Sequence, residues 1–587
     1  MATGIFNGGH AHVNWQRALG HVEIREPLDF FLRLFPMAFV ATILRHTNAE
    51  IERRREIIVQ DRNVQPLEQW EFLRWIGIRL ALALERPRGS LQEIFSDQAI
   101  PGSIFQPCNY SGRFKMSYFR FRQINSVLRF SDNIPPGQNR DPWHEIRSFI
   151  DAFNTHMTEA FSPGQFLTVD EIMSAWKGLS SLFDAFGLPH QTKIIRKPEG
   201  TGAEMKSVAC AESLVILRVD IMEGREQNRL KQWSQQYGEG TAVVLRLCSP
   251  WAGSGRIVIA DSAFSSVKTL IALFSILGLF FGGMVKTAHT HFPKDYFKQW
   301  FDRKNAEHQR DPVNNPRGDW ITLQSTFRNT ANPEDLTEHP IYAVGWADKV
   351  LKHIVCNFGT SLRCPSDSRR PRKRVAVDPE TGFNETINYE KVIKRPDFIK
   401  KFFDGFAAID INDHYRQGIL EMERTWLTPR WWMRIFTTMM GVIFTNCFFA
   451  YRLEFYLRRR HGVGEEEAPE FIAFLGKLAY SLILNPFIPG RRDVRRRREE
   501  ENGIEEHIPG EHRLDYLRNL PEYINLRLGG HPEPTTRRAK RRCKLCKRMA
   551  SMYCVPCSDT VADKLYVLCG PGSENKCCNE HLTMNNH

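Results

Sequence analysis

The chain has 587 residues, of which 42% are hydrophobic and 25% charged, a composition typical of globular proteins with several domains. Eighty Lys and Arg residues against 67 Asp and Glu residues give a net charge of +13, which favours a polyanionic partner. The first 17 residues carry Gly, His and Asn where a secretory signal needs an apolar run, which excludes such a signal and predicts the cytosol or the nucleus.

The first part of the chain has a helical pattern. Residues 1–25 are expected to be a flexible N-terminus, and residues 26–161 a helical domain, because apolar residues recur every three or four positions in 27–46 and 70–85. Residues 113–130 interleave basic and aromatic side chains. This stretch fits either an amphipathic helix with solvated arginines or a surface that lies along a phosphate backbone.

Residues 162–290 have the pattern of an α/β sheet. A strand at 165–171 carries Asp170 at its end, and a basic loop with Lys193, Arg196 and Lys197 follows. Two extended runs in 206–222 and a short helix at 241–248 precede the apolar run 257–260, which is typical of a strand buried on both faces. A helix at 265–277 and a buried strand at 279–286 complete this part.

Asp261 ends the buried strand 257–260. Ligands of open α/β sheets gather at the carboxyl ends of strands, so this carboxylate is a candidate metal ligand or acid/base. By position alone it can equally start a turn or cap a helix.

Residues 291–395 lack clear periodicity and are predicted to be an insertion, with short strands near 320–326 and 341–345. The basic run 368–374 is expected to be a loop, and a solvated surface, nucleic-acid binding and nuclear import all remain open for it. Helical periodicity returns in 396–460, which we expect to complete the sheet domain. Residues 461–536 have the composition of a charged linker with one apolar helix at 471–484.

Two apolar stretches, 269–285 and 435–451, resemble membrane spans. Both are at or below the minimum length of a bilayer-spanning helix, and glycines at 278, 282 and 283 interrupt the first. We expect both to be buried in the protein, without a membrane partner.

Three aspartates occur on elements that suit phosphoryl transfer. In an RNase H-like sheet, carboxylates from the first strand, the fourth strand and a later helix hold two Mg²⁺ ions about 4 Å apart. Asp170, Asp261 and Asp410 occur in that order on elements of those types. Asp413 lies at i+3 from Asp410, so a fourth carboxylate can reach the same site.

These motifs resemble those of the piggyBac transposases and the transposase-derived proteins related to them. The matching pieces are 167–171 (LTVDE) with Lys177-Gly178, 259–261 (IAD) with Phe264-Ser265, Val285-Lys286, and 409–413 (IDIND), and the likeness extends over residues 25–585. Two positions depart from the family pattern. Ser262-Ala263 stands where the family often has Asn-Trp, and Ala407-Ala408 where it often has Gly-Gly, but neither change removes a carboxylate.

The resemblance implies a multidomain α/β protein: a helical dimerisation and DNA-binding domain, an RNase H-like mixed sheet flanked by helices and interrupted by the insertion, and a small zinc-binding module. It implies a nuclear DDE/D enzyme that acts as a homodimer on double-stranded DNA, cutting transposon ends and joining them to TTAA targets. Asp170, Asp261, Asp410 and Asp413 would hold the two Mg²⁺ ions.

The last 51 residues, 537–587, contain the strongest local motif. Eight soft ligands suffice for two closed, structural zinc sites: Cys543, Cys546, Cys554, Cys557, Cys569, Cys577, Cys578 and His581. We expect Cys543 and Cys546 to pair with the Cys569 region, and Cys554 and Cys557 with the group from Cys577 to His581. The remaining six cysteines are scattered, as reduced core thiols would be.

A basic run precedes this module and includes Arg537, Arg538, Lys540, Arg541 and Arg542, which are candidate DNA-binding residues. The sequence therefore leaves two functions open. An active transposase uses all four carboxylates, whereas a domesticated DNA- or chromatin-binding protein keeps the fold without cutting. A zinc-module interaction protein, such as a ubiquitin ligase, leaves the four acids without a role.

Overall fold

A computed structural model of the protein describes residues 10–15, 25–57, 64–99, 102, 104, 106–132, 141–178, 187–197, 199–286, 289, 291–310, 316–329, 331–332, 334, 336–365, 368–377, 384–460, 467–490, 514–517, 541–559 and 564–569. The chain divides into two compact units, Met1–Ile488 and Pro489–His587. Each unit is described by itself.

The first unit begins with the expected helical region. Its helices are α1 (Pro27–Leu34), α2 (Met37–Ile57), α3 (Gln69–Glu85), α4 (Leu91–Phe95), α5 (Tyr110–Phe114), α6 (Tyr118–Val127) and α7 (His144–Ala160). The basic and aromatic stretch forms α5 and α6, and two of its arginines pair with carboxylates of α3, Arg113 at the surface and Arg120 where it is largely covered. Arg113 bonds Glu85 at 2.6 Å, and Arg120 bonds Glu71 at 2.5 Å. These pairs favour the amphipathic-helix interpretation.

A nine-stranded mixed sheet follows, with the strand order β4-β5-β3-β7-β8-β11-β10-β9 and with β6 paired to β5. Its strands are β3 (Phe166–Ala175), β4 (Thr192–Lys193), β5 (Thr201–Cys210), β6 (Ile216–Ile221), β7 (Ile257–Ala260), β8 (Phe280–Met284), β9 (Trp320–Arg328), β10 (Glu338–Ala347) and β11 (Leu351–Cys356). Strands β3, β7 and β8 are parallel, and the other pairs are antiparallel. A small pair, β1 (His12–Val13) with β2 (Phe161–Ser162), lies outside this sheet.

Helices connect and cover the sheet. They are α8 (Arg225–Leu230), α9 (Ser234–Tyr237), α10 (Glu239–Cys248), α11 (Val267–Leu277), α12 (Lys294–Arg310), α13 (Asp397–Phe406), α14 (Ala408–Asp413), α15 (Met422–Thr425), α16 (Trp431–Arg460) and α17 (Phe471–Ile483), with a 3₁₀ turn at Ser249–Trp251 and a π-helix at His414–Leu420. The helix predicted at 241–248 and the strand predicted at 279–286 are confirmed.

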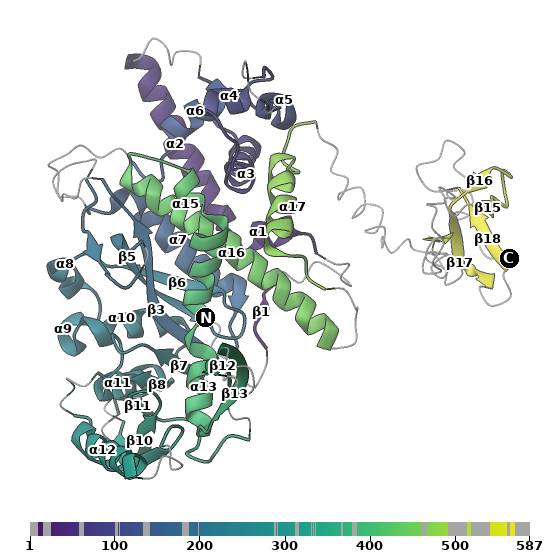
Figure 1. Ribbon diagram of the computed structural model, residues 1–587. Coiled ribbons are helices and arrows are strands. Elements are labelled where there is room, and N and C mark those ends of the chain that lie inside the picture. The colour runs from purple at the N-terminus through teal and green to yellow at the C-terminus, as the bar shows by residue number, and fades with distance from the viewer. Residues whose placement is uncertain are drawn as a thin grey trace. The chain divides into compact units, whose positions relative to one another are not determined.

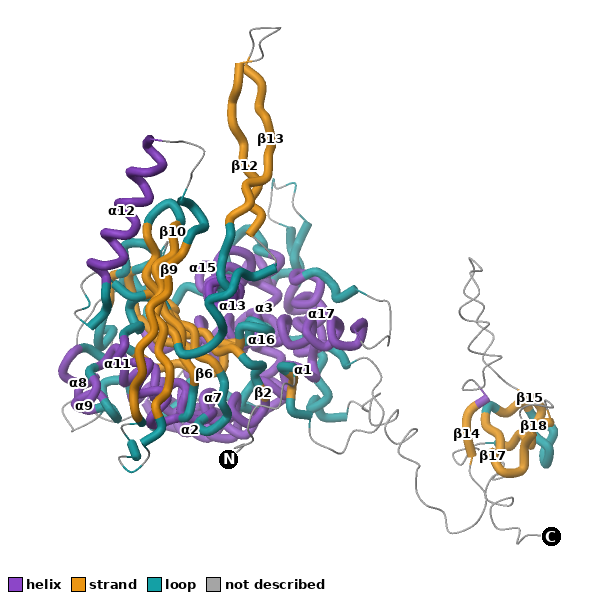
Figure 2. Tube along the Cα trace, turned by 90° about the horizontal axis from the view of Figure 1, so that it is seen from below, coloured by secondary structure: helices purple, strands orange, loops and turns teal. Residues whose placement is uncertain are grey.

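The predicted insertion differs from expectation in two respects. Strands β9, β10 and β11 extend the main sheet beyond β8, because β11 pairs with β8 through Ile354, Val355 and Cys356. The basic run expected as a loop is instead a strand, β12 (Ser368–Val377), paired with β13 (Asn384–Ile393). This two-stranded ribbon stands out from the body of the first unit (Figure 2).

Helix α16 runs through the middle of the first unit (Figure 1). By length and composition alone this helix could cross a membrane, as could the bent pair α1 and α2, but 94% of the most apolar window of α16 is buried inside the protein. Its buried Asn446 is bonded within the fold, to both the N–H and the C=O of Ile216, at 2.8 and 2.7 Å. The helix therefore has the environment of a core helix.

Helix α17 packs against α3, so the compact first unit extends to Ile488, into the segment 461–536 expected to be a linker. The contact is close because α3 carries Gly77 at the crossing. A Cβ at Gly77 would lie 2.8 Å from Ile483 N and 2.9 Å from Ala479 O, both backbone atoms of α17. Arg74 adds a hydrogen bond to Ile483 O at 3.1 Å.

Replacing Gly77 with Ala should lower the free energy of unfolding by about 1–3 kcal/mol, because the two helices must move apart. Gly476→Ala on α17 is the matched control, since nothing lies within 4 Å of its added Cβ. This substitution at an exposed position should raise the free energy of unfolding by roughly 0.5–1 kcal/mol, because alanine has a higher helix propensity than glycine. Urea unfolding of both variants measures the difference, and equal stabilities would contradict the close crossing.

The described residues of the second unit form short β-strands. Its described strands are β14 (Leu514–Tyr516), β15 (Arg541–Arg542), β16 (Met549–Ala550), β17 (Met552–Asp559) and β18 (Lys564–Leu568). Strands β14, β17 and β18 form one antiparallel sheet, and β15 pairs with β16. A small core of Leu517, Tyr553, Val567 and Leu568 lies beside buried cysteines.

Candidate active site

The register of the central strands places Asp170 beside Asp261. Strands β3 and β7 run parallel, and their last pair is Val169 with Ala260. Strand β7 ends there, whereas β3 continues to Ala175 because β5 still pairs with it. The two aspartates that follow this last pair therefore share one edge of the sheet. Asp170 lies in the middle of β3, which corrects the prediction that it ends its strand.

Helix α14 supplies two more carboxylates. Its inner side is fixed by Ile409, which is fully buried, and by Asn412, whose side chain donates to Leu214 O at 3.0 Å. Asp410 and Asp413 lie one turn apart on the remaining side. The Asp410 side chain is 57% exposed and that of Asp413 is 9% exposed.

The preceding helix, α13, ties α14 to the sheet. Thr168 lies two residues before Asp170 on β3. Its hydroxyl Oγ1 donates a hydrogen bond to Gly405 O at 2.7 Å. A Cβ at Gly405 would lie 2.8 Å from Ile259 Cδ1, so a glycine is needed for this close approach. The helix that leads to Asp410 and Asp413 is thus held directly on the strands that carry Asp170 and Asp261.

Two adjacent cations from the loop between β4 and β5 connect these carboxylates. Arg196 contacts Asp261 Oδ2 at 3.2 Å and also bonds Glu171. Lys197 lies 3.7 Å from Asp410 and 3.4 Å from Asp413, and its ammonium donates to Glu171 O at 2.6 Å. The two cations therefore link Glu171 and three of the four predicted aspartates, Asp261, Asp410 and Asp413.

Glu171 is a fifth carboxylate, and its burial shapes the electrostatics of the site. Burial raises the pKa of the Asp170 carboxyl to about 8, and the adjoining Glu171 carboxylate adds to this shift. Burial opposes ionisation of Glu171 too, but the Asp170 carboxyl and the Arg196 guanidinium lower its pKa to about 2. Without a further cation at this edge, Asp170 holds a proton and Glu171 is the charged member of the pair.

Arg416 holds Asp413 from the interior of the protein. Its guanidinium is fully buried, contacts Asp413 Oδ1 at 2.8 Å, and bonds Glu423. It also donates to Met173 O on β3 at 3.1 Å. Asp413 is therefore held through one oxygen, while its other oxygen faces Lys197.

The donor set fits divalent metal ions. Arg196 and Lys197 lie among the carboxylates, Arg416 holds one oxygen of Asp413 from the core, and the buried Oε2 of Glu171 has no hydrogen-bond partner in the described part of the chain. Carboxylate oxygens from separate elements are the ligands that Mg²⁺ prefers. The residues named for this role in the sequence are thus brought together in a suitable arrangement.

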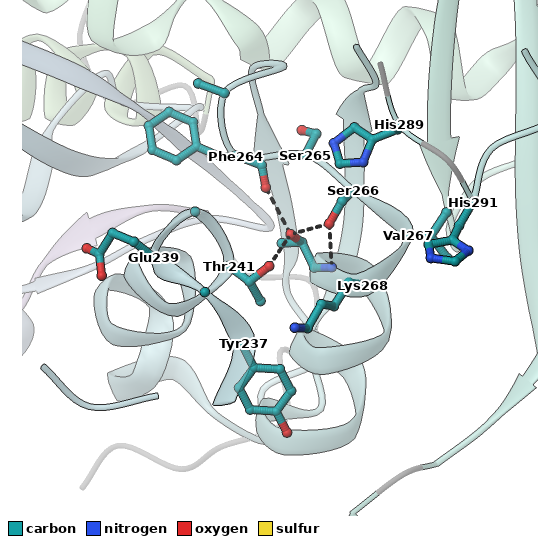
Figure 3. Close-up of a pocket in the computed structure, with 14 residues that line it drawn as sticks. Tyr237, Glu239, Thr241, Phe264, Ser265, Ser266, Val267, Lys268, His289 and His291 are labelled. Atoms are coloured by element: carbon teal, nitrogen blue, oxygen red, sulfur yellow. Dashed lines mark hydrogen bonds between the residues drawn. The ribbon is translucent and has the colours of Figure 1, made fainter. Parts of the chain in front are cut away.

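A cavity of about 310 Å³ is lined in part by Ala263 to Ser266, in the loop that follows Asp261 (Figure 3). Its wall includes Ala263 and the start of α11, where Ser266 caps the helix and Thr269 bonds Thr241 at 2.8 Å. None of the five carboxylates lines it. This cavity is distinct from the carboxylate edge, and its hydroxyl groups bond to one another.

In the second unit, three of the predicted zinc ligands form a cluster. The ligand atoms of Cys543, Cys546 and Cys569 lie within 4.8 Å of one another, and the sulfurs of Cys546 and Cys569 are 3.3 Å apart. This is the first of the two expected groupings, and three soft sulfur ligands at such spacing are compatible with zinc.

The other predicted residues of this unit are placed only in part. Cys554 and Cys557 lie on β17, and Arg541 and Arg542 form β15. Outside the described residues lie Cys577, Cys578, His581, Arg537, Arg538 and Lys540.

The chain is similar to known transposases in sequence and in fold. A family described as Transposase IS4 matches residues 26–448, which contain all five carboxylates. The chain belongs to this transposase family. A solved structure with a similar fold is the cryo-EM piggyBac transposase synaptic complex with hairpin DNA, at a TM-score of 0.55 and 18% identity, covering 93% of this chain and 95% of that chain. No curated protein matches the chain.

The resemblance to piggyBac transposases and the mixed α/β fold are therefore confirmed, and the transposase family is of the DNA-cleaving DDE type. Sequence reasoning named the four aspartates but did not assign roles to Glu171, Arg196 or Arg416. Two signals were available: the basic loop that contains Arg196, and the i, i+3 spacing of Asp413 and Arg416.

Arg416→Met should lower the free energy of unfolding by about 3–5 kcal/mol, because it takes the paired guanidinium from the buried Glu423 carboxylate and leaves Asp413 with Lys197 alone. Arg196→Met is the matched control, since Arg196 also bridges two carboxylates but is 58% exposed. This substitution should lower the free energy of unfolding by no more than about 1 kcal/mol. Thermal or urea unfolding without divalent metal compares the two, and a larger loss in the Arg196 variant would be inconsistent with this difference in burial.

Proposed function

We propose that this protein is a piggyBac-like DNA transposase that cleaves transposon ends and joins them to TTAA-type target DNA in a metal-dependent reaction. The observation that carries this proposal is the convergence of Asp170, Asp261, Asp410 and Asp413 on one sheet edge, around Arg196 and Lys197. The strand order β6-β5-β3-β7-β8, with β3, β7 and β8 parallel, supports an RNase H-like catalytic sheet.

Two Mg²⁺ ions held by these four aspartates would supply positive charge to the attacking and leaving oxygens of an in-line displacement. The protein's own residues prepare the site for them. Arg416 orients Asp413, and the pairing of β3 with β7 sets the separation of Asp170 and Asp261. Because the carboxylates come from three elements fixed in the core, little rearrangement is needed when the ions bind.

Arg196 and Lys197 have different roles in this proposal. Lys197 is 13% exposed and anchored on Glu171 O, so it stays in place between Asp410 and Asp413. Arg196 is 58% exposed, and its long side chain can leave the carboxylates for a DNA phosphate when metal takes its place. The loop thus supplies one fixed cation and one that can turn to the substrate.

The second unit would bind DNA through its structural zinc sites and the neighbouring basic residues. We propose two Zn²⁺ ions, one of them on Cys543, Cys546 and Cys569 with a fourth ligand from the rest of the unit. The partners would be double-stranded transposon ends and target DNA in the nucleus. A homodimer would bring the two ends of one element together.

Asp261→Asn should abolish metal-dependent nicking of terminal-repeat DNA by the full chain, because it removes one charged ligand. DNA binding should be unchanged. The rise of the melting temperature with Mg²⁺ or Mn²⁺ should also be lost, since the metal then binds the folded state less tightly. Asp348→Asn, which breaks an ordinary ion pair with Arg317, is the control and should retain both properties.

Wild-type protein that binds such DNA without nicking it in the presence of metal would instead indicate a transposase-derived binding protein. Equal nicking by the wild type and the Asp261 variant would overturn the assignment of the site. Sequencing of joined products tests the target, since TTAA should flank each insertion.

Cys546→Ser should release about one zinc ion per chain and weaken binding of terminal DNA, because a structural zinc site stabilises its unit by folding it. Loss of Cys554 should release the second ion. Cys108→Ser, at a partly buried free cysteine of the first unit, should leave the zinc content unchanged. Metal analysis of the purified proteins measures this, and full zinc occupancy in the Cys546 variant would refute the site.

A further inference from the structure

One face of the buried helix α16 contacts the elements that carry the candidate metal ligands. Thr438 on this helix bonds Ser174 on β3, with 2.7 Å between their hydroxyl oxygens. Further along the helix, Asn446 accepts a hydrogen bond from Asn412 on α14 at 3.3 Å. Between these two polar residues α16 has Gly441, the only glycine among its 30 residues.

Gly441 leaves room for the side chain of Arg416. A Cβ at position 441 would lie 2.9 Å from Arg416 Cγ and 3.2 Å from Arg416 Cδ. Both distances are shorter than the separation at which carbon atoms normally pack, about 3.5–4.0 Å. Any side chain at position 441 must therefore push the stem of Arg416 aside.

The stem of Arg416 has little freedom to move, because the residue is held at both ends. At the backbone end, Glu421 N donates to Arg416 O at 3.0 Å, the i to i+5 bond of a π-helix. At the other end, the guanidinium contacts Asp413, bonds Glu423 and donates to Met173 O at 3.1 Å. Arg416 is only 1% exposed, so no solvent space lies beside it.

A shift of the guanidinium would act directly on Asp413. Two nitrogens of Arg416, Nε and Nη2, donate to the same oxygen, Asp413 Oδ1, at 3.2 and 2.8 Å. Because both nitrogens belong to one rigid planar group, they fix this oxygen in position and direction. The second oxygen, Oδ2, faces Lys197 at 3.4 Å and turns with the carboxylate.

We propose that Gly441 is a positioning residue of the metal site, which acts through Arg416 on the orientation of Asp413. Neither Gly441 nor Arg416 is a metal ligand. The glycine decides where the stem of the arginine runs, and the arginine decides how Asp413 presents its second oxygen. The proposal rests on the proposed function, because it treats Asp413 as a ligand of the divalent metal.

A glycine in a buried helix can also serve only the close approach of two elements, as Gly77 does between α3 and α17. The atoms nearest to a Cβ at Gly77 belong to Ala479 and Ile483 of α17, and none belongs to the metal site. At Gly441, by contrast, both atoms that the Cβ would meet outside its own helix belong to one charged side chain that ends on Asp413. The two glycines therefore form a matched pair.

The test compares Gly441→Ala with Gly77→Ala in the full-length protein. Each variant adds one methyl group at a crowded helical glycine. Circular dichroism and melting temperature establish that both are folded, and calorimetry without DNA measures their dissociation constants for Mn²⁺.

Gly441→Ala should bind Mn²⁺ about tenfold more weakly than the wild type, since changes to the groups that orient metal ligands typically weaken metal binding by about 10- to 100-fold. Gly77→Ala should bind Mn²⁺ as the wild type does. If the wild type nicks terminal-repeat DNA, the Mn²⁺ concentration for half-maximal nicking by Gly441→Ala should rise by the same factor, with unchanged affinity for the DNA.

A double-mutant cycle tests the route through Arg416. In an Arg416→Ala background the stem is gone, so the added methyl group at position 441 meets nothing and should cause no further loss of Mn²⁺ affinity. The comparison of Gly441→Ala with Gly77→Ala does not depend on the folding of the Arg416 variant, and it decides the proposal where that variant fails to fold.

Equal Mn²⁺ affinity of the wild type and Gly441→Ala would overturn this inference and leave the proposed metal site intact. The same loss in Gly77→Ala would show a general effect of loosened packing and would also overturn it. So would a loss from Gly441→Ala that persists in the Arg416→Ala background. A wild type that binds no Mn²⁺ would contradict the proposed function, and the inference would fall with it.

Discussion

The repulsion among five carboxylates at one edge of the sheet is the constraint on which the rest of the catalytic region depends. Asp170, Glu171 and Asp261 lie on or beside neighbouring strands, and Asp410 and Asp413 on the helix packed next to them. Without metal, Arg196, Lys197 and a proton on Asp170 offset this repulsion. The cluster is thus costly to keep unless another cation binds, which is the physical basis for regarding it as a metal site rather than an ordinary ion-pair network.

Rigid support for these groups comes from deep in the core. Asn446 on α16 bonds the backbone of Ile216 on β6, and it lies 3.3 Å from the side-chain nitrogen of Asn412 on α14. This arrangement fixes the helix that carries Asp410 and Asp413 to the buried central helix and to the sheet at once. Buried hydrogen bonds that join two helices and a strand in this way favour one relative arrangement of the three.

The segment between β8 and α13 has two parts that are separate in structure. Its strands β9, β10 and β11 enlarge the main sheet, whereas β12 and β13 leave the sheet and form the ribbon. The ribbon returns to the body immediately before α13, the helix that is bonded to β3 through Gly405.

The sequence by itself determined the elements and the chemistry of their ends. Apolar runs predicted β3, β7 and β8, the helical spacing predicted α16, and the short motifs around Asp170, Asp261 and Asp410 indicated a transposase, because these patterns depend on neighbouring residues. Only the tertiary structure decided which of these residues and elements lie in contact. That Asp170 lies inside β3, that Arg196 reaches Asp261 while Lys197 reaches Asp410 and Asp413, and that residues 368–374 form a strand all depend on contacts between distant segments, and no local pattern records such contacts.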